Sequence, residues 1–156
     1  MKKYRLESST TVPVSLREAF EFFESPYNLA RITPPWLNFR ITTKERIQMR
    51  KGAEIRYLIR WLGIPIRWKT EITAYEPPFF FVDEQASGPY AYWRHRHEFT
   101  PTESGTIVSD HVEYALPFGP LGRFMHWLRV GSQLEEIFDY RRKALAEVLT
   151  GLPTAK

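Results

Sequence analysis

Two histidines and two aspartates are the residues of this sequence best suited to acid–base chemistry. His95 and His97 are separated by a single residue, Asp83 precedes them and Asp110 follows. The imidazole pKa lies close to neutral pH, and a carboxylate beside the ring sets its tautomer and raises its basicity. If these segments meet in the fold, His95 or His97 is the candidate catalytic base and Asp110 is the candidate orienting group.

The alternation of side chains along a strand predicts which of these groups share a face. In residues 92–99 the charged side chains alternate with the histidines and must contact water, so the inward set is Trp93, His95, His97 and Phe99. In residues 106–114 the same alternation places Val108, Asp110, Val112 and Tyr114 on the inward face. On the preceding strand, the same alternation places Phe81, Asp83 and Gln85 on the inward face. A slip of one residue there would exchange the two faces.

Three interpretations of such a cluster remain open. The carboxylates could satisfy the histidines within a buried hydrogen-bonded network, or the cluster could be the polar end of a pocket that orients an apolar ligand. His-X-His with two carboxylates could also bind zinc or iron. We predict no metal, because the third interpretation depends on the uncertain direction of Asp83.

Several other chemistries lack the residues that they need. The sequence has no cysteine, which excludes disulfides, thiolate metal sites and cysteine nucleophiles. It has no Gly-X-Ser-X-Gly elbow and no Gly-rich phosphate loop, so we expect no cofactor. Basic and aromatic residues alternate in residues 92–97, but on a strand they face opposite sides, and we expect no nucleic-acid partner.

Composition indicates a single domain that spans residues 1–156, with 151–156 as a loose tail. The chain is 43% hydrophobic and 15% aromatic, which suits one large core or a lined pocket. Its 22 Lys and Arg exceed 18 Asp and Glu, and we expect the basic groups, including residues 141–143, on solvated faces. No apolar run reaches the roughly 18 residues of a membrane span. We expect a cytoplasmic monomer or weak dimer.

The periodicity predicts the elements that position the cluster. A strand over residues 3–12 precedes a capping box formed by Ser15 and Glu18, and a second short helix follows over residues 27–32. Period-two segments with frequent turn signals between Trp36 and Leu116 predict six antiparallel strands. Residues 120–149 predict one long helix whose apolar stripe we expect to pack entirely on the sheet.

A single helix rarely fills the hollow of a curled seven-stranded sheet, so this α+β arrangement predicts a cavity. Apart from the inward sets named above, we expect Tyr57, Trp61 and Trp68 to line it from the sheet, and Leu128 and Gly131 from the helix. The expected ligand is a small apolar or aromatic molecule. Loops that combine Gly or Pro with a large apolar residue are gate candidates, namely those that carry Trp36, Tyr90 and Phe118.

The order of elements and several motifs resemble the START-like or SRPBCC superfamily. The motifs include Gly63-Ile64-Pro65, Glu76-Pro77-Pro78, Phe81-Val82-Asp83-Glu84-Gln85, Trp93-Arg94-His95-Arg96-His97 and Tyr114-Ala115-Leu116-Pro117-Phe118-Gly119. The chain resembles in particular the small bacterial ligand-binding proteins related to polyketide cyclase/dehydrase and lipid-transport domains. This resemblance implies a helix-grip (Bet v 1-like) fold and binding of a lipid, isoprenoid or polyketide. The alternative that it implies is a cyclase or dehydratase acting on a bound carbonyl compound.

Overall fold

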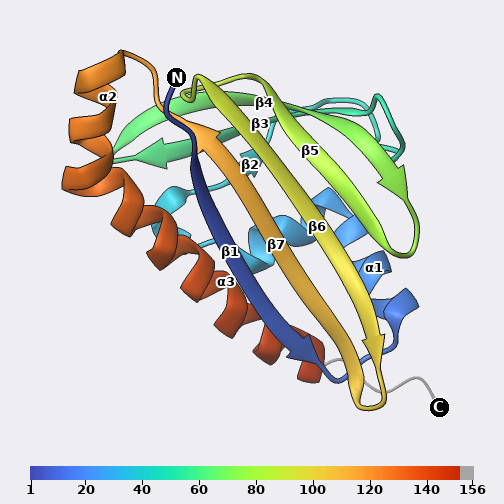
Figure 1. The fold of residues 1–156 in the computed structure, drawn as a ribbon. Helices are drawn as coiled ribbons and strands as arrows, with labels where there is room; N and C mark the ends of the chain where they lie inside the picture. The colour runs from blue at the N-terminus through green and yellow to red at the C-terminus, as the bar shows by residue number, and fades with distance from the viewer. Residues whose placement is uncertain (152–156) are drawn as a thin grey trace.

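The computed structural model describes residues 1–151 and contains one antiparallel sheet of seven strands (Figure 1). The strands lie in the order β1-β7-β6-β5-β4-β3-β2. Their bounds are β1 Tyr4–Val12, β2 Arg40–Ile41, β3 Glu54–Trp61, β4 Ile64–Glu76, β5 Phe80–Ser87, β6 Tyr92–Thr102 and β7 Gly105–Ala115. The seven-stranded helix-grip fold is therefore confirmed, and each strand from β3 to β6 pairs with the next one along the chain.

The strand register brings the candidate polar residues opposite one another. Asp83 on β5 pairs with His95 on β6, and His97 on β6 pairs with Asp110 on β7. All four side chains point to the same side of the sheet because strand residues alternate between faces. On the outer face, Arg94 of β6 lies 3.3 Å from Glu84 of β5, as expected for the wet side.

Short helices between β1 and β2 close one end of the sheet. They are α1 (Leu16–Glu24) and the 3₁₀ segments η1 (Pro26–Ile32) and η2 (Pro35–Leu37). The predicted capping box is present, since the amide of Glu18 donates to Ser15 Oγ and the amide of Ser15 donates to Glu18 Oε2. Phe20, Phe22 and Phe23 of α1 are buried in the core.

The C-terminal helix starts and ends close to its predicted bounds but contains an irregular turn. It consists of α2 (Gly119–Met125), a π-helical turn η3 (His126–Val130) and α3 (Gly131–Thr150). A Cβ atom at Gly131 would lie 3.0 Å from Cε1 of His126, so the glycine accommodates this imidazole. His126 in turn contacts the sheet, where the Tyr114 hydroxyl lies 2.7 Å from its Nε2.

The apolar stripe of this helix packs on the sheet only in part. Leu134, Phe138, Leu145 and Leu149 of α3 are buried, as predicted. Leu121, Phe124 and Leu128 are each more than half exposed, so the expectation that the whole stripe packs on the sheet was wrong. The π turn shifts the helical phase, which a constant period of 3.6 residues does not predict. The expected tail, residues 151–156, lies outside the described residues from 152 onward.

Candidate functional site

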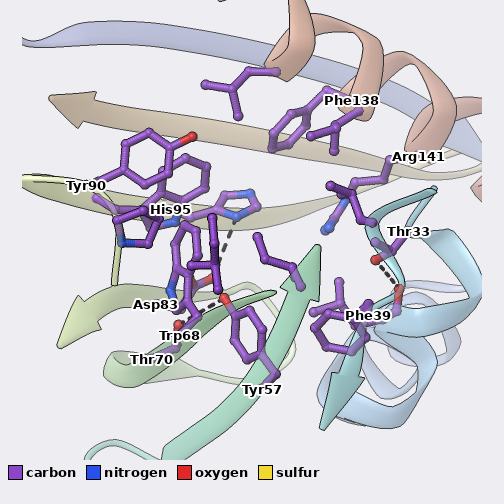
Figure 2. Close-up of a pocket in the computed structure, with 18 of the residues that line it drawn as sticks. Thr33, Phe39, Tyr57, Trp68, Thr70, Asp83, Tyr90, His95, Phe138 and Arg141 are labelled. Carbon is purple, nitrogen blue, oxygen red and sulfur yellow. Dashed lines mark hydrogen bonds and ion pairs between the residues drawn. The ribbon is translucent and has the colours of Figure 1, made fainter. Parts of the chain in front are cut away.

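A cavity of about 430 Å³ lies between the sheet and the C-terminal helix. Aromatic side chains dominate its sheet wall, and these are Tyr57, Trp61, Trp68, Phe81, Tyr90 and Trp93. The helical segments contribute Phe23, Leu29, Leu134, Phe138 and Arg141, among others. Figure 2 shows Arg141 extending from α3 toward the side where His95 and Asp83 lie, with Tyr57 and Trp68 on the sheet wall.

The polar end of the cavity is a compact cluster of ionisable groups. His95 Nε2 lies 2.8 Å from Asp110 Oδ1, and His97 Nε2 lies 2.6 Å from Asp83 Oδ2. Arg141 Nη2 lies 3.3 Å from both Asp110 Oδ1 and His97 Nδ1. The centroids of the two imidazole rings lie 3.7 Å apart, and the ring planes are tilted by 34°. Asp83, His95 and His97 line the cavity, whereas Asp110 lies behind the histidines.

Burial and the neighbouring charges shift the pKa values of this cluster in different directions. Burial alone would raise the pKa of Asp110, but the Arg141 charge and the histidine hydrogen bonds lower it well below its usual range. Burial would lower the pKa of His97, but hydrogen bonds to Asp110 and Asp83 raise it. Burial and the charge of His97 lower the pKa of His95. Between the two rings, the surroundings therefore favour a proton on His97 over one on His95.

Arg141 lines the cavity although the sequence analysis did not place it there. Residues 141–143 were predicted to form a solvated basic group, and this is correct for Arg142 and Lys143, which are exposed. The Arg141 side chain is only 8% exposed. Its position could have been found from the helical period, because it follows the buried residues Leu134 and Phe138 at intervals of seven and three.

Two buried N–H groups in the described part of the chain have no hydrogen-bond partner, and both belong to residues that line this cavity. They are Nε1 of Trp68 and Nε of Arg141. A buried donor without an acceptor costs about 1–3 kcal/mol. Trp61 differs, because its Nε1 donates to Gln133 of α3. Both side chains therefore line the cavity with other atoms, while these two nitrogens are turned away from its open space.

Of the residues predicted to face the cavity, several lie elsewhere. Gln85 instead bonds the backbone N and O of Tyr90 and thereby ties the turn between β5 and β6. Tyr114 contacts His126, which is half-buried at the rim. Leu128 is 56% exposed and Gly131 faces His126, so neither contributes to the wall.

The three gate candidates also differ in position. Tyr90 and Phe118 lie among the residues around the cavity. Trp36 lies outside that set and packs edge-on against Tyr140, with ring centroids 5.8 Å apart.

The cluster contains atoms that could bind a metal ion. One ligand atom each from Asp83, His95 and His97 lie within 4.8 Å of one another. These groups already form hydrogen bonds with one another, and the Arg141 guanidinium lies 3.3 Å from Asp110 Oδ1. A cation would have to break these hydrogen bonds beside a guanidinium, so the arrangement favours an ion network over a metal site.

Comparison with known families gives one match that covers most of the chain. The family described as "Polyketide cyclase / dehydrase and lipid transport" matches residues 12–137. A comparison with curated proteins gives no match. None of the described helices is both long and apolar enough to cross a membrane.

Solved structures share the fold at low sequence identity. The Zhui aromatase/cyclase from Streptomyces sp. R1128 aligns with a TM-score of 0.76 at 13% identity, covering 96% of this chain and 94% of that protein. TTHA0849 from Thermus thermophilus aligns at 0.69 and 17% identity, covering 98% and 100%. Major latex-like protein 151 from Panax ginseng aligns at 0.70 and 13% identity, covering 97% and 99%.

Proposed function

The chain belongs to the polyketide cyclase / dehydrase and lipid transport family, and from this premise we propose that it binds a small, largely apolar molecule of lipid, isoprenoid or polyketide type. The cavity between sheet and helix supports this proposal. Its volume of about 430 Å³ is in the range of small-molecule sites, and its wall is mainly aromatic and aliphatic. Burial of apolar surface contributes about 25 cal/mol per Å², so such a wall favours an apolar ligand.

The two unpaired donors narrow the class of ligand. Trp68 Nε1 and Arg141 Nε have no partner within the described residues, and a carbonyl, carboxylate or hydroxyl oxygen of a ligand would supply one when the side chain turns toward the cavity. We therefore expect an apolar or aromatic body that carries such oxygens, with one of them directed to Arg141. A plain hydrocarbon would leave both donors unsatisfied.

A titration with paired probes tests this function. Purified protein is analysed by native mass spectrometry for co-purified molecules and then titrated with an aromatic ketone and with the corresponding hydrocarbon. We expect the ketone to bind more tightly. Trp68→Phe keeps an aromatic ring but removes the donor, and it should weaken ketone binding roughly fivefold while changing hydrocarbon binding by less than about twofold. Absence of any bound molecule and of probe binding would refute the proposal.

Catalysis on a bound carbonyl compound is the second candidate, and the geometry of His95 is the observation that favours it. Its Nε2 is held by Asp110, whereas Nδ1 lies 3.7 Å from Asp83 Oδ2 and has no hydrogen bond within the described residues. Burial and the charge of His97 lower the pKa of His95, so its ring is neutral near pH 7. A neutral imidazole oriented by a carboxylate is the arrangement of a general base.

Separate measurements of binding and turnover distinguish the two candidates. If His95 is the base, His95→Gln should abolish product formation from a polyketone substrate and change ketone-probe affinity by no more than a few fold. His97→Gln is the matched comparison, because this ring is also buried but its Nε2 is bonded to Asp83 at 2.6 Å. Equal losses of binding and turnover in both variants would assign the histidines to a structural network and would contradict the catalytic role.

A further inference from the structure

A ridge of large apolar side chains is exposed at the start of the C-terminal helix. It comprises Phe118, Leu121, Phe124, Trp127 and Leu128, which we call the apolar ridge, and each is between 53% and 79% exposed. The Phe124 and Trp127 rings lie 6.0 Å apart, so the ridge is continuous across the boundary between α2 and η3. Exposed apolar groups this dense within one short segment are typical of an interaction surface.

The charges around the ridge are mainly positive. The sequence has no acidic residue between Glu113 and Glu135, and Arg123 and Arg129 are exposed within that interval. Lys2 lies over the Tyr4 ring, which stacks on His126 of the π turn, so the N-terminal lysines lie at the same end of the molecule (Figure 1). The carboxylates Glu135 and Glu136 follow on α3, and Glu136 lies 3.9 Å from Arg129.

We propose that the apolar ridge docks on the surface of an anionic lipid membrane. Aromatic and leucine side chains on one side of a helix, flanked by basic residues, bind the boundary between head groups and acyl chains. Each Lys or Arg near an anionic surface adds to the attraction. Two copies of the chain that met through this ridge would bring their arginines together, so charge favours the lipid surface over self-association.

The ridge is also part of the cavity wall. Phe118 and Leu121 lie among the residues around the cavity, together with Gly122 and Met125 of the same segment. A docked protein therefore has this wall of its cavity against the lipid. Docking itself follows from the surface and does not depend on the ligand proposed above.

Vesicle co-sedimentation tests the docking. The full chain is mixed with vesicles of phosphatidylcholine alone or of phosphatidylcholine with phosphatidylglycerol, and the bound fraction is measured against lipid concentration. We expect binding to the anionic vesicles that weakens with added salt. Phe124→Ser with Trp127→Ser should weaken it by more than about tenfold, because two apolar side chains lose their burial in lipid. Arg123→Gln should weaken it roughly fivefold on anionic vesicles only.

Matched variants separate this proposal from a folding defect and from the proposed ligand. Tyr27→Ser with Phe79→Ser removes two similarly exposed aromatic residues, in η1 and at the turn between β4 and β5, and should leave vesicle binding unchanged. Phe124 and Trp127 lie outside the cavity wall, so their variant should retain probe binding and the wild-type melting temperature. The proposal is overturned if the wild type does not bind anionic vesicles, if both double variants bind equally, or if the ridge variant instead abolishes a dimer or a complex with another protein.

Discussion

Arg141, Asp110 and the two histidines depend on one another for charge compensation at the buried end of the cavity. The Asp110 and Arg141 side chains are 6% and 8% exposed, and their closest charged atoms lie 3.3 Å apart. Removing one member of a buried ion pair leaves the other uncompensated, which costs far more than the pair contributes when intact. The cluster is therefore expected to be sensitive to single substitutions that barely change its shape.

Asp110→Asn tests this dependence. We expect a loss of about 3–5 kcal/mol in the free energy of unfolding, because Arg141 loses its anionic partner and His95 loses its charged hydrogen-bond partner. The matched control is Asp139→Asn, which breaks the exposed pair of Asp139 and Arg142 at 2.8 Å and should cost less than about 0.5 kcal/mol. Urea unfolding at neutral pH measures both. Similar losses in the two variants would contradict the buried network.

The pH dependence of stability follows from the lowered pKa values of the carboxyls. In the folded state the pKa of Asp110 is well below its usual value, and the pKa of Asp83 is also lowered. The pKa of aspartate in the unfolded chain is about 3.9. Their contribution is therefore complete above the unfolded value and is lost as the pH falls through the folded values. Unfolding curves below about pH 5 should show this loss in the wild type and a shallower decline in Asp110→Asn. If the free energy of unfolding declines equally with falling pH in the wild type and in Asp110→Asn, Asp110 does not contribute to this loss.

The residues of the cluster differ in how well the sequence could predict them. His95, His97 and Asp110 followed from strict alternation on β6 and β7, where charged neighbours mark the outer face. Arg141 did not, because its charge and its neighbours Arg142 and Lys143 favoured a solvated face, although the helical period places it on the buried stripe. Its environment comes from Asp110 and His97, which are distant in sequence and meet it only in the folded chain.

The turn between β6 and β7 is the element where the backbone tolerates least change. Gly105 has φ +152°, and a Cβ atom there would lie 2.0 Å from the carbonyl oxygen of Val12 on β1. Gly105→Ala should therefore cost about 3 kcal/mol, since the obstacle is backbone that cannot rotate away. Gly52 has φ +85° with open space around it, so Gly52→Ala should cost only about 1 kcal/mol. Thermal unfolding compares them, and equal losses would contradict the close approach.

Sequence periodicity was sufficient to predict some elements of the fold and not others. The antiparallel strands and the capped α1 were predictable because alternation, turn residues and the Ser15 box act over a few neighbouring residues. The π turn at His126–Val130 was not, because it depends on His126 fitting between Gly131 and Tyr114. For the same reason Leu128 was placed in the cavity by its period but lies on the surface.

The segments around the cavity differ in how firmly they are held, and we predict that a ligand enters at the least constrained of them. The turn that carries Tyr90 is held by both side-chain hydrogen bonds of Gln85, which opposes opening there. The segment before α2 has fewer constraints, because Phe118 is 79% exposed and precedes Gly119. Residues Ile32, Thr33 and Leu37 also line the cavity on the side of η1 and η2.

Hydrogen exchange with and without an apolar probe identifies which segment moves. We expect fast exchange in residues 117–122 of the free protein and at least roughly tenfold slower exchange when the aromatic ketone saturates the cavity, since the ligand stabilises the closed form. Residues 32–37 should show a smaller effect, and the Tyr90 turn should not change. Exchange in 117–122 that is slow without probe, or that saturation leaves unaltered, would exclude Phe118 as a gate. Protection at 32–37 instead would place entry beside η1 and η2, away from the apolar ridge.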